Sequence, residues 1–334
     1  MCSMRAACCW APCTTARRRA GNVRLRARPD LPPPARRLNP PCHLDGLSDD
    51  LVLRLLSRAP FTTHGTLHVV SRRLKTLLRS PEFGQQRVDS GLAEYGLVVA
   101  GGMRDFRAIT DCSMLISGRW RPITPMSGPR SGACSAVIDN ELWMCGGDDG
   151  GELLATVEVY SPASNTWRSL PAMNEGRDGA VCGVVGGSLV VAGGDDGDDA
   201  LTSFEVYSPA AGRWNAIAPL PHEASKATAC VLNGRLFVAG GLGSDRLQMW
   251  DTKKWTLKAP MPAVRQQAAS VVHEGKMMVI GGNVDRTPSA SVILYDPQTD
   301  TWADGPPLPS PRFACRAVQH AGAVILAGDG SPLR

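Results

Sequence analysis

Residues 130–147 read RSGACSAVIDNELWMCGG, and this stretch decides the fold. It holds two short apolar runs joined by a tight polar turn and ends in a pair of glycines, which is the pattern of a β-hairpin. Residues 177–194 (RDGAVCGVVGGSLVVAGG) repeat the form, and so do residues 224–241, 265–282 and 312–329. A hairpin that recurs along the chain indicates a repeat architecture.

The glycine pairs set the period of the repeat. Their first glycines are Gly101, Gly146, Gly193, Gly240 and Gly281, separated by 45, 47, 47 and 41 residues, and a degraded pair begins at Gly328 after 47 more. A tryptophan follows each of the first five pairs, at steps of 47, 47, 41 and 47 residues: Trp120, Trp167, Trp214, Trp255 and Trp302. A fixed period of about 40 to 50 residues is typical of solenoids and propellers.

A second hairpin follows the glycine pair. Residues 156–170 (TVEVYSPASNTWRSL), 203–217 and 291–305 each have a tyrosine seven residues before the tryptophan. Four strands per unit at this period predict a β-propeller blade, with glycines where backbones crowd near the axis and an aromatic pair packing one blade on the next. Because the sixth unit is half present, either an exchange of terminal strands closes the ring or the chain is truncated.

The order of Gly-Gly, Tyr and Trp over residues 93–334 resembles that of kelch repeats. The resemblance implies an all-β kelch propeller with five tryptophan-containing blades and a partial sixth. It also implies a ligand on one rim of the ring, which kelch proteins commonly use for binding.

Residues 41–83 have a helical pattern instead. Ser48 is a good N-cap, two aspartates follow in the first turn, where negative charge is favourable, and Pro60 ends the segment. A second apolar series from Leu67 to Leu78 has the spacing of one helix face. A helical piece this small cannot bury all of its leucines alone, so its apolar surface should meet a partner.

The stretches LDGLSDDLVLRLLSRAP (44–60) and LHVVSRRLKTLLRSPEF (67–83) resemble the F-box of plant-type F-box/kelch proteins. Two positions depart from that pattern: Ser48 replaces the usual proline of a Leu-Pro opening, and Leu74 replaces a common tryptophan. The resemblance implies a small α-helical F-box before the propeller and a Skp1-like adaptor as its partner. The residues that would pack this F-box or contact the adaptor are Leu44, Leu47, Leu51, Leu55, Leu56, Leu67, Val70, Leu74 and Leu77.

The net charge of +5 is unevenly distributed. Residues 1–40 contain nine arginines and one acid, a local charge of +8, which leaves −3 for the remaining residues. A near-neutral body argues against a nucleic-acid surface. Because residues 1–40 also lack the apolar core of a secretion signal, they fit a disordered basic leader, an over-extended gene start or an organelle transit peptide.

No apolar run approaches the roughly 20 residues of a membrane-spanning helix, so no membrane is expected as a partner. The 11 cysteines show no zinc spacing. Four of them, Cys134, Cys182, Cys230 and Cys315, fall near one position of the repeat, which indicates small core side chains in a reduced, intracellular protein. The predicted location is cytoplasmic and/or nuclear, with an organelle as the alternative.

Catalysis has little support in the sequence. Some kelch-type propellers are copper oxidases, but three of the four tyrosines belong to the repeat, and the six histidines show no metal spacing. Every glycine pair ends an inner strand, so none is a phosphate loop, and there is no nucleophile elbow. No catalytic residue, cofactor or metal is expected.

An arginine stands 16 residues before the glycine pair in four units, at Arg130, Arg177, Arg265 and Arg312, whereas Ala224 breaks the series. This position opens the innermost strand, so a ring would place the guanidinium groups around one mouth of the channel. There they would suit an acidic or phosphorylated peptide. The alternative is that each arginine only bonds carbonyls of neighbouring loops.

The loops after the glycine pairs should face the same rim, because antiparallel strands return to the same end after every second strand. Two of these loops are acidic, with Asp148, Asp149, Asp195, Asp196, Asp198 and Asp199. The rim would then be acidic over the second and third blades and basic elsewhere, which favours a ligand of mixed charge. Solvated loop charges without a partner are the alternative.

Together these features predict the substrate-recognition subunit of an SCF-type ubiquitin ligase. By resemblance, the F-box binds a Skp1-like adaptor and so joins a cullin complex, the propeller captures a protein substrate, and an E2 enzyme of the wider complex delivers ubiquitin. The chain would supply proximity and no bond chemistry, so it is not expected to be an enzyme. The alternative is a kelch scaffold whose helical segment covers the propeller, and the substrate is not identified by the sequence.

Overall fold

The structure is a computed structural model that describes residues 3–7, 95–116, 119–320 and 323–328. All of these belong to one compact unit, formed by residues 1–13 and 93–334. The F-box expected at residues 41–83 lies outside the described residues, as does the expected leader apart from residues 3–7. The described residues form strands, turns and loops and no helix, as an all-β propeller requires.

Four sheets have the same build, with four antiparallel strands in chain order from the axis outward. Blade 2 consists of β7 (Cys134–Ile138), β8 (Glu141–Cys145), β9 (Val157–Ser161) and β10 (Thr166–Leu170). Blade 3 consists of β11 (Val181–Val185), β12 (Ser188–Ala192), β13 (Phe204–Ser208) and β14 (Arg213–Ile217). Blade 4 consists of β15 (Thr228–Leu232), β16 (Arg235–Ala239), β17 (Leu247–Trp250) and β18 (Trp255–Lys258). Blade 5 consists of β20 (Ala269–His273), β21 (Lys276–Ile280), β24 (Val292–Asp296) and β25 (Thr301–Asp304).

The first and last units are built differently. In blade 1, β2 (Tyr95–Ala100), β5 (Cys112–Ile116) and β6 (Arg119–Pro122) are antiparallel, and β1 (Ser3–Ala7) pairs with β2 in parallel. Blade 6 has two strands in the described residues, β26 (Arg316–His320) and β27 (Ala323–Ala327). Short strands lie in loops: β3 (Met103–Arg104), β4 (Arg107–Ala108), β19 (Arg265–Gln266), β22 (Asn283–Val284) and β23 (Thr287–Pro288).

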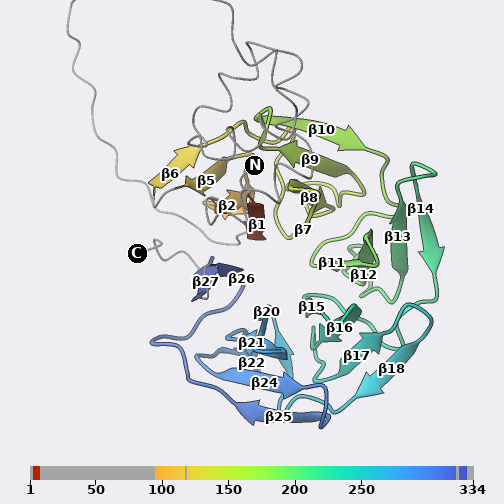
Figure 1. Ribbon diagram of the computed structural model, residues 1–334, viewed down its shortest axis with the longest axis vertical. Helices are drawn as coiled ribbons and strands as arrows, with labels where there is room; N and C mark the ends of the chain where they lie inside the picture. Colours follow the sequence, from red (N-terminus) through yellow and green to blue (C-terminus); the bar gives the residue numbers. More distant parts are fainter. Residues whose placement is uncertain (1–2, 8–94, 117–118, 321–322, 329–334) are drawn as a thin grey trace, which may run out of the picture. The chain divides into compact units, whose positions relative to one another are not determined.

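The blades form a closed ring (Figure 1). The innermost strands of the described residues neighbour one another in the order β1, β7, β11, β15, β20, β26 and back to β1. Blade 1 also packs directly on blade 6, where Leu97 and Ala327 are buried among apolar side chains of both. The ring therefore has six blade positions, and residues 3–7 supply the innermost strand of the first.

The core of the protein lies between adjacent blades. Val157 and Val159 of β9 pack with Leu189 and Val191 of β12, for example. The outer strands add a polar bond, because the indole of Trp167 in blade 2 donates to the carbonyl of Thr124, at the end of blade 1, at 2.8 Å. The same bond joins each of the next three blades to the one before it. The aromatic residues thus pack one blade against the next, as the repeat predicts.

The glycine pairs are required where neighbouring backbones meet. Gly240 has a φ of +68°, and a Cβ on it would stand 2.2 Å from the carbonyl oxygen of Arg265 in the next blade. Any larger residue would force the two blades apart, which confirms the reason expected for the repeat glycines.

Candidate functional site

Three of the repeat arginines point into their blades and do not surround a channel mouth. Arg130, Arg177 and Arg265 are 4%, 0% and 5% exposed. Each donates from Nη1 to the carbonyl oxygen of the first glycine of its own blade's pair. The sequence reveals the spacing of these arginines but not the direction in which their side chains point. That direction is set by the glycine carbonyl oxygens, which accept hydrogen bonds from the guanidinium groups.

A buried carboxylate completes the site of two of these arginines. Arg130 Nε lies 3.2 Å from Glu158, and Arg177 Nη2 lies 2.8 Å from Glu205. In blade 5 the hydroxyl of Ser291 accepts from Arg265 instead, at 2.8 Å. Guanidinium groups held in this way tie the strands of a blade together, and the geometry gives them no access to a ligand.

The remaining two repeat positions differ. Arg312 is half-buried, and its backbone N–H donates to Ser289 at 3.0 Å. At Ala224 no guanidinium is present, and Gln248 occupies the place of the glutamate. Gln248 accepts from the N–H of His222 at 2.9 Å and donates to the carbonyl of the same residue at 3.1 Å. Blade 4 thus fills the position without charge.

The acidic loops do share a rim with the segments that open the inner strands. Asp148 pairs through its backbone with Ser131, and Asp195 pairs with Asp178, each with two bonds of 2.9–3.0 Å. The loop carboxylates turn back on their own backbones: Asp149 accepts from Glu152 and Gly151, both at 2.9 Å.

The same local bonds favour the ionised form of two of these carboxylates. The N–H groups of Glu152 and then Gly151 lower the pKa of Asp149, and those of Asp199 and then Asp198 lower the pKa of Asp196. Asp196, Asp198 and Asp199 are exposed, whereas Asp148, Asp149 and Asp195 are half-buried. This part of the rim therefore presents a stable negative charge to solvent.

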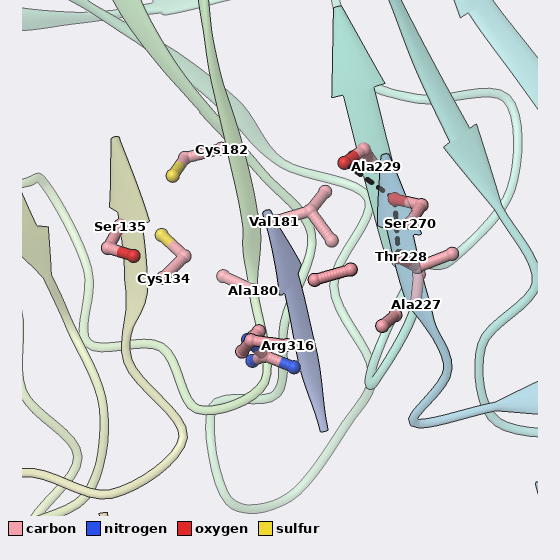
Figure 2. Close-up of a pocket in the computed structure, with 12 residues that line it drawn as sticks. Cys134, Ser135, Ala180, Val181, Cys182, Ala227, Thr228, Ala229, Ser270 and Arg316 are labelled. Carbon is pink, nitrogen blue, oxygen red and sulfur yellow. Dashed lines mark hydrogen bonds between the residues drawn. The ribbon is translucent and has the colours of Figure 1, made fainter. Parts of the chain in front are cut away.

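The central channel holds a cavity of about 120 Å³ between the inner strands of blades 2 to 6 (Figure 2). Small side chains line most of it, as the crowding of strands near the axis requires. Arg316 of β26 is the exception in size and charge among the residues that line it. Cys134 of β7 and Cys182 of β11 face one another across the same space (Figure 2).

A hydrogen bond joins the two channel thiols. Hydrogen bonds from Cys145 and Cys182 lower the pKa of Cys134, and the positive charge of Arg316 acts in the same direction. The bond to Cys134, followed by burial, raises the pKa of Cys182. None of the cysteines in the described residues forms a disulfide. Of the four expected core thiols, Cys134, Cys230 and Cys315 are buried, whereas Cys182 is half-buried.

A series of backbone hydrogen bonds links blades 2 to 6 beside the channel. In each bond a backbone N–H donates to the backbone carbonyl oxygen of the corresponding residue in the preceding blade, at 2.8–3.1 Å. The residues joined in this way are, in order, Gly132, Gly179, Lys226, Gln267 and Ala314. Each donor belongs to the blade after its acceptor, and all five residues have φ between 52° and 61°. These residues, which we call the belt, lie beside a smaller cavity of about 20 Å³ that Asp178 and Arg316 also line.

Arg316 is the channel residue that the sequence interpretation missed, although a signal for it exists. Four residues after the repeat arginine position, the successive units have Cys134, Val181, Thr228, Ala269 and Arg316. Aligning the units at this position shows one long cation among small side chains. The repeat arginines have the more regular spacing in the sequence, but Arg130, Arg177 and Arg265 are buried.

Two absences bear on the chemistry of the described residues. Within them, no three His, Cys, Asp or Glu side chains are grouped so that they could hold a metal ion. No helix there is long and apolar enough to cross a membrane.

Comparison with known proteins agrees with the ring and its repeats. The kelch motif matches residues 129–174, 176–221 and 265–309, which correspond to blades 2, 3 and 5 with the segments leading into them. A solved structure described as "Structure of YjhT" aligns with a TM-score of 0.58 at 18% identity, over 65% of this chain and 83% of that one. The repeats and the ring define a kelch-type β-propeller. The chain contains kelch repeats, and kelch repeats indicate a propeller that interacts with proteins.

Proposed function

We propose that this chain is the substrate-recognition subunit of an SCF-type ubiquitin ligase. The observation that carries the proposal is the joining, in one chain, of a kelch propeller to the F-box-like pattern of residues 44–83. Its leucine series would bind a Skp1-like adaptor and so a cullin complex, while the propeller would hold a protein substrate for ubiquitination and degradation. The chain itself would have no catalytic role.

The rim of blades 2 and 3 is our candidate for the substrate surface. Asp148, Asp149, Asp195 and Asp196 lie there in loops whose backbone bonds hold them in place. Because Arg130 and Arg177 of the same blades are buried, their charge does not offset these carboxylates at the surface. A substrate segment with Lys or Arg side chains would therefore suit this rim.

The adaptor half of the proposal is tested by a pull-down of the full chain with a Skp1-like adaptor. Leu51→Asp and Leu74→Asp place a charge within the predicted apolar stripe and should abolish binding. Lys75→Asp introduces the same side chain on the predicted polar face and should leave binding intact. Circular dichroism and tryptophan fluorescence of each variant establish that the propeller is folded.

Failure of the folded wild-type chain to bind the adaptor would contradict the ligase role. The chain would then be a kelch scaffold without a role in ubiquitination. Binding that survives both leucine substitutions would contradict the assignment of the stripe, because a buried aspartate in an adaptor interface is strongly unfavourable.

A further inference from the structure

The guanidinium of Arg316 lies in the central channel without a partner of opposite charge. Arg316 begins β26 and lines both the larger cavity and the smaller one at the belt. Among the described residues, no side chain or backbone group forms a hydrogen bond or ion pair with it. This contrasts with Arg130 and Arg177, whose charges are matched by buried glutamates.

Arg316 is half-buried, so its guanidinium has lost part of its contact with water. Alanine, valine and cysteine side chains form much of the surrounding wall (Figure 2). A charged group that loses part of its water requires a counter-charge or hydrogen bonds to compensate. The channel therefore favours an anion as the missing partner of Arg316.

The hydroxyl groups of the channel differ in their availability. Thr228 donates to Ser270 at 2.7 Å, and Ser270 donates to the carbonyl of Ala229 at 2.8 Å, so both protons are in use. Ser135, which lines the same cavity, forms no side-chain hydrogen bond within the described residues. Arg316 and Ser135 are thus two open donors facing one space.

The charges beside the smaller cavity are of both signs. Lys226 of the belt lines the smaller cavity together with Arg316. Asp178 lines it too, and its Oδ1 has no hydrogen-bond partner in the described residues. Burial raises the pKa of Asp178, while the charge of Lys226 lowers it. The positive charge of Arg316 acts to lower the pKa of both Cys134 and Cys182 and so favours their thiolate forms.

We propose that the central channel binds a small free carboxylate, held by the guanidinium of Arg316 with the hydroxyl of Ser135 as a second donor. A planar carboxylate matches the paired N–H groups of a guanidinium, which a spherical anion does not. A cavity of about 120 Å³ accommodates three or four heavy atoms with accompanying water. The smaller cavity beside the belt, about 20 Å³, has room for a group of water size.

This site is independent of the proposed ligase role, because it uses neither the F-box-like segment nor the acidic rim. A protein that fails to bind a Skp1-like adaptor can still bind a carboxylate in its channel, and the reverse also holds. The two proposals can therefore fail separately.

The test is calorimetric titration of the full chain with sodium formate and sodium acetate, with sodium chloride at equal ionic strength as the reference. We expect one saturable site for the carboxylates with a millimolar dissociation constant, because ligands of three or four heavy atoms have little binding energy to contribute. Arg316→Gln should weaken binding at least about tenfold, and Ser135→Ala by a smaller factor. Arg213→Gln, at an exposed arginine of β14, should not change it.

Three results would overturn the proposal: no saturable carboxylate binding by the wild type, undiminished binding by Arg316→Gln, or chloride binding as tight as that of formate. A carboxylate could also come from the side chain of a bound polypeptide, and a blocked glutamate, N-acetylglutamyl amide, tests this source. Its binding more tightly than acetate would assign the channel to a side chain of a bound polypeptide.

A wild-type measurement covers the case in which Arg316→Gln does not fold. Formate on Arg316 should slow the labelling of Cys134 and Cys182 by iodoacetamide, because it fills the cavity and offsets the charge that favours the thiolates. Peptide mass spectrometry reports the labelled cysteines. Equal labelling rates in formate and chloride would count against the site.

Discussion

The carboxylate of Glu205 and the guanidinium of Arg177 meet at 2.8 Å with both side chains closed to solvent, 2% and 0% exposed. Blade 2 has the same pair in Arg130 and Glu158. Blade 4 replaces both partners at once, with Ala224 and Gln248 at the two positions. Blade 5 differs from both: it keeps the buried Arg265, has Ile293 at the glutamate position, and bonds the guanidinium to the hydroxyl of Ser291. A glutamate is therefore paired with the buried arginine in blades 2 and 3 only.

Removing one partner of this pair should be more damaging than removing both. Glu205→Ala leaves the buried charge of Arg177 with Glu175, which is 37% exposed and lies 2.5 Å from Nη2, as its remaining acidic partner. We expect the free energy of unfolding to fall by up to about 3 kcal/mol. The double variant Arg177→Ala with Glu205→Gln copies blade 4 and should recover a large part of that loss. Urea denaturation of the three proteins checks this. Equal stability of the single and double variants would show that the charges do not act as a pair.

Asp300 should make blade 5 sensitive to acid. The hydroxyl of Tyr295 and then the N–H of Ala259 lower the pKa of Asp300, donating to it at 2.6 and 2.9 Å. Because its pKa is lower in the folded than in the unfolded protein, its contribution to stability is present above the unfolded value, about 4, and is lost as the pH falls through the folded value.

Asn165 shows how to test this dependence, since it accepts the corresponding bond from Tyr160 at 2.8 Å without a charge. Asp300→Asn should therefore keep the bond from Tyr295 and reduce the loss of stability between about pH 7 and about pH 3. Urea midpoints at the two values measure the effect. Asp304→Asn, at an exposed residue of β25, is the control. If the two variants lose stability in acid equally, the bonds to Asp300 are not responsible.

The indole bonds between blades should be worth more where the tryptophan is buried. Trp214 is 6% exposed and donates to the carbonyl of Pro171 in the preceding blade at 2.9 Å. Trp214→Phe should cost about 1–2 kcal/mol through the lost bond. Trp120 of blade 1 is 37% exposed and makes no such bond within the described residues, so Trp120→Phe should cost less than about 0.5 kcal/mol. Similar melting temperatures for both variants would contradict this assignment.

The belt offers a stabilising substitution. Ala314 has a φ of 52°, a left-handed conformation that costs an alanine about 1–2 kcal/mol. Ala314→Gly removes this strain, and we expect a modest rise in melting temperature because part of the gain is lost to the greater freedom of glycine in the unfolded chain. Gly179→Ala should do the opposite, since its φ is 61° and the added Cβ would lie 3.0 Å from Lys226 Cγ. A fall in stability for both variants would show that the belt tolerates no change.

The repeat made the fold predictable, because glycine pairs and tryptophans at a fixed spacing constrain every blade alike. The direction of the arginines was not predictable in the same way. It depends on the glycine carbonyls that all three arginines reach, and in blades 2 and 3 also on Glu158 and Glu205, which lie 28 residues beyond their partners. The alternative in which repeat arginines bond carbonyls is the one that the structure has in blades 2, 3 and 5.

Two further features depend on contacts that a local pattern does not contain. Residues 3–7 read SMRAA and belong to the segment interpreted as a basic leader, yet they pair with β2. That pairing follows from the open inner edge of blade 1, which is formed some 90 residues later in the chain. The channel position of Arg316 likewise becomes evident only when the units are placed around a common axis.

The belt is built from main-chain groups alone, so its side chains are not needed to hold it. Glycine, lysine, glutamine and alanine all occupy the same place in successive blades. The side chains beside this part of the channel can therefore differ from blade to blade while the hydrogen bonds that link blades 2 to 6 are kept. A repeat protein of this kind separates the part that must stay constant from the part that can acquire a new specificity.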